Sequence, residues 1–280
     1  MRLTKKGLIN RAKAGGFDPS LHLVDDWVDR GLLDRPHRKG RGRGKGVASY
    51  WPDEQVQLLL LLLQKRDELD GRSLKPLYNI PVALWLFWGD RYASSDQVHR
   101  ALKSWLKGSE RTAIRSAKRY ARQYLSDIEH PDTNREDREL AFEELYRAIR
   151  GEGDLRYLRK SIGWLFDPQE EGRTIGPSEA PMTSQNVVRL IEARLLAWQN
   201  IGSITPRQLE LARISHNQAL IEYHKKRPAL AQDPDLGHIY QSLTLDQVVN
   251  TACVDLLTVV GLGLLISSKP DPDDQAPDNG

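Results

Sequence analysis

The chain has 280 residues, of which 39% are hydrophobic, so it can bury a sizeable core in about one or two domains. Its one cysteine, Cys253, excludes an internal disulfide and a cysteine-based zinc site and fits a reducing compartment, so we expect a cytoplasmic protein. The net charge of +3 conceals an asymmetry: residues 1–122 carry 25 Lys and Arg against 13 Asp and Glu, a balance of +12, and the rest carry 16 against 25, a balance of −9. The basic part is expected to bind a polyanion.

Helical spacing of apolar residues dominates the sequence and predicts a mainly α fold. Residues 4–14 are predicted to form a short helix, Gly15-Gly16-Phe17 a turn and residues 18–31 a second helix, which is the layout of a helix-turn-helix. The second helix should bury one apolar face, formed by Leu21, Val24, Trp27 and Val28. Its outward face then carries His22, Asp25, Asp26 and Asp29.

A basic segment follows the second helix. Residues 34–49 interleave glycines with cations, which are Arg38, Lys39, Arg41, Arg43 and Lys45. Glycines let a hairpin tip approach a duplex closely, and cations neutralise phosphates and release counterions. The next helix should start at Trp51-Pro52-Asp53-Glu54, where a proline comes early and acids occupy the first turn. The sequence therefore predicts a hairpin wing between two helices.

Residues 1–70 resemble the winged helix-turn-helix DNA-binding domain of the MerR family and its excisionase-like relatives. The resemblance rests on Gly31-Leu32-Leu33 closing the second helix, on the basic wing, and on Tyr50-Trp51-Pro52-Asp53-Glu54-Gln55 opening the next helix. It implies a homodimer that reads two half-sites in double-stranded DNA, with a helix in the major groove and wings on the flanking backbone. The DNA-binding residues expected here are Arg38, Lys39, Arg41, Arg43, Lys45, Lys5, Lys6, Arg11, His22 and Tyr50.

Two features differ from the family pattern. The second helix presents Asp25, Asp26 and Asp29, which phosphates would repel and which could only accept hydrogen bonds from cytosine amino groups. In place of the family's long coiled-coil helix stand six consecutive leucines, Leu58 to Leu63, which are hydrophobic on every side. We expect this helix to be buried beneath residues 74–88.

Residues 71–125 are predicted to form a helical extension. Within it, cations recur at helical spacing on one face, and they are Arg111, Arg115, Lys118, Arg119 and Arg122. Such a stripe could follow phosphates beside the wing as a secondary basic face, or it could be a solvated helix face. The sequence leaves both interpretations open.

Turn-forming residues at 126–137 predict a boundary, and residues 136–268 should form an all-α, bundle-like domain for oligomerisation or regulation. Its amphipathic helices are expected at residues 140–149, 155–166, 187–201 and 209–224. Capping boxes are expected at Thr205 with Gln208 and at Thr244 with Gln247. The apolar run 256–266 is expected to be a buried helix, not a membrane span, and residues 269–280 a disordered acidic tail.

The sequence contains no nucleophile motif and no His or carboxylate spacing that would hold a metal, so no enzyme, metal or other cofactor is expected. Tyr157, Trp164 and Trp198 could line an effector pocket, although aromatic residues at helical spacing usually lie in a core.

Together these patterns favour a DNA-binding transcription regulator of the MerR-like type. Its expected partners are double-stranded DNA, a second copy of the chain and an unidentified small-molecule or protein effector, with no membrane. One alternative is an accessory DNA-binding factor of a mobile element, such as an excisionase-like or partition protein. Another is a protein-interaction module that uses the helix-turn-helix as a scaffold.

Overall fold

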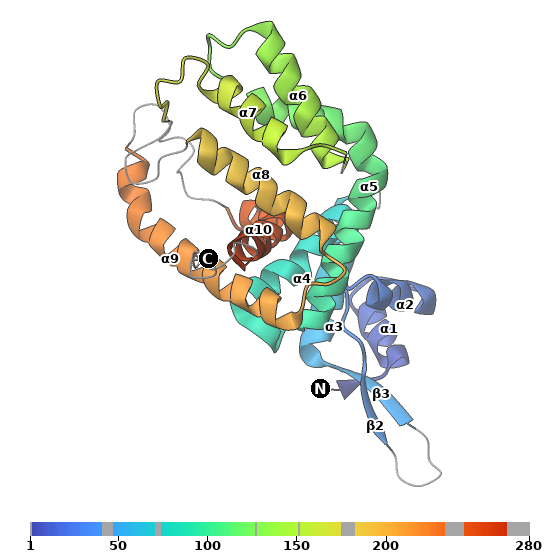
Figure 1. The fold of residues 1–280 in the computed structure, drawn as a ribbon. Helices are drawn as coiled ribbons and strands as arrows, with labels where there is room; N and C mark the ends of the chain where they lie inside the picture. Colours follow the sequence, from blue (N-terminus) through green and yellow to red (C-terminus); the bar gives the residue numbers. More distant parts are fainter. Residues whose placement is uncertain are drawn as a thin grey trace, which may run out of the picture. The chain divides into compact units, whose positions relative to one another are not determined.

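The computed structural model describes residues 2–40, 47–70, 74–126, 128–150, 152–174, 183–232 and 244–267. Ten α-helices and three strands account for most of these residues, which confirms the expected mainly α class (Figure 1). The expected acidic tail at 269–280 lies outside the described residues.

The chain divides into two compact units that each draw on separate stretches of sequence. The first unit comprises Met1–Ser109, Ile204–Arg213 and Leu243–Leu256. The second unit comprises Glu110–Ser203, Ile214–Ser242 and Leu257–Gly280. Local composition predicts consecutive domains, whereas packing gives the first unit residues from near both ends of the chain.

The first unit begins with two short helices joined by a tight turn. The helix α1 (Lys5–Ala14) is capped by Thr4, whose hydroxyl accepts a hydrogen bond from the Gly7 amide. The helix α2 (Leu21–Asp29) is capped in the same way by Ser20. Because Ser20 supplies the cap, α2 begins later than the expected start at residue 18.

The two faces of α2 match the expectation except at its first residue. Val24 and Trp27 are fully buried and Val28 is partly buried, but Leu21 is 48% exposed, so its predicted inward position is wrong. Helical side chains point back toward the amino terminus, so a side chain in the first position extends past the end of the helix and misses the core. On the outward face, His22, Asp25 and Asp29 are exposed and Asp26 is partly buried.

Three short strands form a sheet in the order β1-β3-β2. The strands β2 (His37–Gly40) and β3 (Val47–Pro52) form an antiparallel hairpin in which His37 lies opposite Tyr50. The strand β1 (Arg2–Leu3) pairs with the other side of β3, where Arg2 lies opposite Pro52. A hairpin therefore lies at the basic segment, between α2 and the next helix.

That next helix, α3 (Asp53–Glu68), carries the run of leucines and packs against α4 (Lys75–Trp88). Leu58, Leu59, Leu62 and Leu63 are at most 4% exposed, whereas Leu61 is 43% exposed. The expected burial is confirmed for most of the run. Leu61 faces solvent because neighbouring elements do not cover every side of α3.

A short 3-10 helix, η1 (Gly89–Arg91), leads into α5 (Ser95–Ser126), and the first unit is completed by the starts of α9 (Pro206–Leu230) and α10 (Leu245–Ser267). The buried Asn79 of α4 accepts a hydrogen bond from the Cys253 amide at 3.0 Å. Cys253 itself is fully buried, and this burial raises the pKa of its thiol well above the usual value. The start of α10 is thereby held to α4.

Within the described residues, α10 is the one helix long and apolar enough to cross a membrane, and 33% of its most apolar window is buried.

The core of the second unit consists of the end of α5 together with α6 (Arg135–Ile149), α7 (Leu155–Phe166) and α8 (Ser184–Gln199). α6 packs on α7, and α7 on α8. Four fully buried apolar residues come from α7, and they are Leu158, Ile162, Leu165 and Phe166. The helices α6, α7 and α8, together with α9 (Pro206–Leu230), correspond to the four that the sequence predicts.

The turn at 126–137 is present, but it joins α5 to α6 inside the second unit. Ile128 is 5% exposed, and the buried Thr133 hydroxyl donates to the Leu165 carbonyl at 2.8 Å. Both contacts tie the turn to the core of that unit.

Candidate nucleic-acid interface

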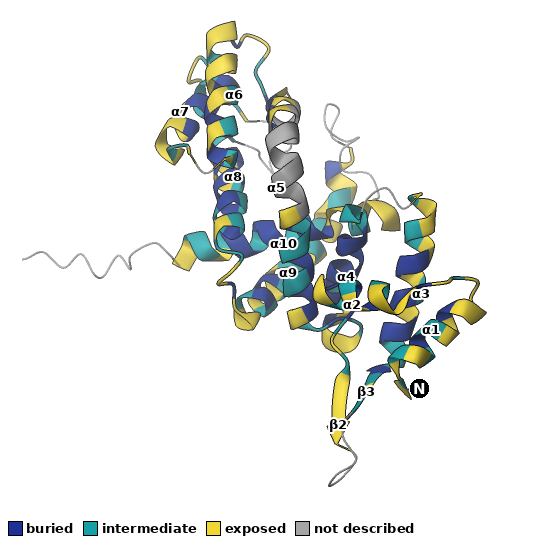
Figure 2. Ribbon diagram, turned by 90° about the vertical axis from the view of Figure 1, so that its right-hand side faces the viewer, coloured by how far each residue is buried: buried dark blue, intermediate teal, exposed yellow. Residues whose placement is uncertain are grey.

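The hairpin presents cations on an exposed strand. All four residues of β2 are exposed, including Arg38 and Lys39 (Figure 2). Among the described residues, no carboxylate forms an ion pair with either cation. The other expected wing cations, Arg41, Arg43 and Lys45, lie outside the described residues. Cations that are not neutralised within the protein are free to bind phosphates.

Tyr50 lies at the base of the hairpin in contact with two basic side chains. Its ring stacks on His37, with the centroids 5.6 Å apart and the planes at 18°. The guanidinium of Arg2 lies 4.8 Å from the centre of the same ring. Arg2 is not among the residues that the sequence identified, because its place beside Tyr50 depends on the pairing of β1 with β3.

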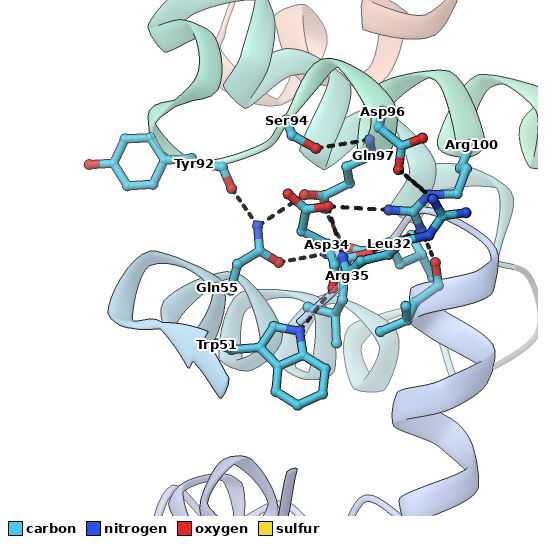
Figure 3. A network of polar contacts seen from close by, with 12 residues as sticks. Leu32, Asp34, Arg35, Trp51, Gln55, Tyr92, Ser94, Asp96, Gln97 and Arg100 are labelled. Carbon is cyan, nitrogen blue, oxygen red and sulfur yellow. Dashed lines mark hydrogen bonds and ion pairs between the residues drawn. The ribbon is translucent and has the colours of Figure 1, made fainter. Parts of the chain in front are cut away.

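Two buried glutamines connect the start of α3 to the loop before the hairpin (Figure 3). Gln55 Oε1 accepts a hydrogen bond from the Asp34 amide at 2.8 Å, and its Nε2 donates to the Tyr92 carbonyl at 2.7 Å. The same Nε2 donates to Gln97 Oε1 at 2.9 Å, and Gln97 donates to the Leu32 carbonyl at 2.9 Å. Buried polar groups that lose such partners are costly, so these bonds restrain the loop.

Arg100 of α5 adds a second set of restraints to the same loop. Its guanidinium donates to the Val28 carbonyl at the end of α2 and forms an ion pair with Asp34 at 3.3 Å. Its Nε bonds Asp96 at 3.0 Å. From the hairpin side, the Trp51 indole donates to the Asp34 carbonyl at 2.8 Å. The hairpin is therefore fixed relative to α2, α3 and α5.

The acids of α2 are largely neutralised by cations of the protein. Asp25 forms an ion pair with Lys5 of α1, and Asp26 forms one with Arg30 at 2.7 Å. The hydrogen bonds that Arg30 forms with Tyr78 and Asp26 raise the pKa of its guanidinium. Lys5 is thus engaged within the protein, although the sequence identified it as a DNA-binding residue.

The other expected DNA-binding residues of this region remain at the surface. Lys6 and Arg11 of α1 and His22 of α2 are exposed. Within the described part of the chain, none of the three forms an ion pair. The first unit therefore carries exposed cations on both α1 and β2.

The secondary basic face lies in the second unit. Lys118 Nζ lies 5.3 Å from the centre of the Tyr146 ring, and the Arg122 guanidinium lies 5.1 Å from that of Phe142. These two cations are exposed, but they also pack on the rings of α6. The side chains of Arg111, Arg115 and Arg119 lie outside the described residues.

Where the chain is described, no group of three His, Cys, Asp or Glu side chains could hold a metal ion. The three aromatic residues considered for an effector pocket differ in exposure, and Trp198 is partly buried. Tyr157 is 63% exposed, and Trp164 is covered by Lys160 at 4.6 Å. A cavity of about 560 Å³ lies beside α7, α8 and α10, lined by both charged and apolar residues that carry no sequence motif.

Comparison of the chain with protein-family models, with curated proteins and with solved structures finds no match.

Proposed function

We propose that residues 1–70 bind double-stranded DNA as a winged helix-turn-helix and that the protein is a transcription regulator of the MerR-like type, acting as a homodimer. The observation that carries this function is the exposed basic hairpin, whose base is fixed to α2, α3 and α5 by buried hydrogen bonds. A flexible basic loop would lose conformational entropy on binding, whereas a fixed hairpin is already oriented.

The helix α2 is suited to lie close to a duplex despite its acids. Two of its three outward carboxylates already have cation partners, Lys5 and Arg30, so their repulsion of phosphates is reduced. The hairpin and α1 then supply most of the affinity through phosphate contacts, and specificity comes in part from DNA shape.

The decisive experiment measures DNA affinity as a function of salt concentration, using the full chain and a variant with Arg38→Gln and Lys39→Gln. Each phosphate contact contributes about 0.9 to the slope of log affinity against log salt. We expect the double variant to reduce this slope by about two and to weaken binding to all sequences.

The matched control replaces two adjacent exposed cations of α9, Lys225→Gln and Lys226→Gln. This pair removes the same charge from the second unit and should leave the slope unchanged. An equal effect of both variants would show that net charge alone attracts DNA and would refute the assignment of the hairpin. If the affinity of the unmodified chain for DNA does not fall as the salt concentration rises, DNA is excluded as the partner.

Regulation of transcription requires a sequence preference, which selection from genomic fragments with the purified protein would reveal. A homodimer with two half-sites predicts an inverted repeat, enriched upstream of genes. Fragments without a shared motif would contradict a regulatory role.

A further inference from the structure

The second unit contains a cavity beside the amino end of α8, and none of its lining residues is among those assigned to DNA. It has a volume of about 560 Å³ and is lined by residues of α7, α8 and α10. This volume lies within the range of about 300 to 1,000 Å³ found for small-molecule sites.

Two arginines and one glutamate set the charge of the cavity. Glu192 is 5% exposed and accepts a hydrogen bond from Arg159 Nε at 2.5 Å, so its carboxylate is neutralised within the protein. Hydrogen bonding to Glu192 raises the pKa of Arg159, which stays charged. Arg189 has no ion pair with any carboxylate among the described residues. The lining therefore carries one net positive charge, located at Arg189.

Apolar and uncharged polar side chains complete the lining, with Gln185 among the polar ones. Val188 of α8 and Leu265 of α10 contribute apolar surface, and Ser184 contributes a hydroxyl. The Arg159–Glu192 pair holds one guanidinium in a fixed position, because the buried carboxylate would be costly to leave without a partner. The cavity thus combines a fixed cation, a second cation with no acid partner in the described part of the chain, and an apolar wall.

We propose that this cavity binds a small organic anion, with its anionic head on Arg189 and Arg159 and a short apolar body against Val188 and Leu265. Guanidinium groups match the planar oxygens of such a head through paired hydrogen bonds. The site goes beyond the proposed function, since none of its residues belongs to the hairpin or to α1 and α2.

Isothermal titration calorimetry of the full chain with four probes tests the chemistry of the ligand. Octanoate has both the head and the apolar body, octylammonium reverses the charge, acetate lacks the body, and inorganic phosphate has charge alone. We expect saturable binding of octanoate, with affinity falling by about fourfold for each methylene removed toward acetate. The proposal would be overturned if octylammonium or phosphate bound as tightly as octanoate. It would also be overturned if octanoate showed no saturable binding at about 1 mM.

A pair of variants tests the location. Arg189→Gln removes the cation without depriving Glu192 of its partner, which Arg159→Gln would do. We expect Arg189→Gln to weaken octanoate binding by about tenfold or more, the effect of losing one charge-assisted hydrogen bond. Arg135→Gln, which removes an 85% exposed arginine of α6, is the matched control and should change the affinity by less than about twofold. Equal affinities of the two variants would place the bound anion elsewhere and refute the site.

Discussion

Gly31 stands where the end of α2 meets α5, and its replacement by alanine tests whether that contact exists in solution. Its φ of +78° lies in the left-handed region that favours glycine. A Cβ atom built on Gly31 would lie 2.3 Å from the Ala101 nitrogen and 2.5 Å from the Gln97 carbonyl oxygen. Both are backbone atoms of a helix and cannot rotate away, so α2 and α5 would have to separate.

The cost of Gly31→Ala has two parts. A residue with a Cβ loses about 1 to 2 kcal/mol in the left-handed conformation. Forcing extra volume into a packed site adds about 1 to 3 kcal/mol. The sum of about 2 to 5 kcal/mol is a large fraction of the roughly 5 to 15 kcal/mol that stabilises a domain.

Substitutions at two other glycines of the first unit allow the conformational cost to be measured apart from the packing cost. Gly16 has a φ of +90° but no atom within 4 Å of its added Cβ, so Gly16→Ala should cost only the conformational part, about 1 to 2 kcal/mol. Gly40 meets neither constraint among the described residues, so Gly40→Ala should change the free energy of unfolding by no more than about 0.5 kcal/mol. Urea unfolding followed by circular dichroism would measure all three. If Gly31→Ala costs no more than Gly16→Ala, the close approach of α2 to α5 is refuted.

Three further substitutions or modifications test other parts of the structure. Trp27→Ala should lower the free energy of unfolding by about 3 to 5 kcal/mol in urea titrations, because the indole is fully buried, and full stability would contradict the packing of α2. Cys253 should resist iodoacetamide at pH 8 in the native protein, since burial raises the pKa of its thiol and leaves little thiolate; mass spectrometry should detect alkylation only in denaturant. Asp25→Asn should tighten binding to every DNA sequence, because Lys5 loses its carboxylate partner, whereas weaker binding confined to one motif would show that Asp25 reads a base.

Patterns confined to neighbouring residues were predictable from the sequence. The capping box at Thr205 is confirmed, since Gln208 Oε1 accepts from the Thr205 amide at 2.8 Å and the Thr205 hydroxyl accepts from the Gln208 amide at 3.2 Å. The box at Thr244 and Gln247 is confirmed in the same way. Caps of this kind depend on residues three positions apart, which the sequence displays directly.

Contacts between distant residues were not predictable. Gln55 and Gln97 form a hydrogen bond although they are 42 positions apart in the sequence, and Asn79 and Cys253 form one across 174 positions. Periodicity shows which face of a helix is apolar, but not which helix covers that face. The residue type alone also does not show whether a glutamine is buried or exposed. The ion pair between Lys5 and Asp25 could not be predicted for this reason. The acids of α2 are therefore expected from the sequence to repel phosphates more strongly than they do in the structure.

In the proposed interface, the hairpin supplies most of the affinity for DNA and α2 supplies the selectivity, because ion pairs within the protein reduce the charge of α2. Asp25 and Asp26 are balanced by Lys5 and Arg30, so of the three acids of α2 Asp29 alone adds unbalanced charge among the described residues, whereas the hairpin keeps the charges of Arg38 and Lys39. Phosphates attract such a hairpin at any sequence, and a nearly neutral helix can discriminate only through shape and hydrogen bonds. Raising the salt concentration should therefore weaken binding to selected and to random duplexes by the same factor. The ratio of the two dissociation constants, measured from about 50 to 200 mM salt, should stay constant within about twofold. A ratio that falls steeply with salt would show that charged groups of α2 read the bases, and would refute this division.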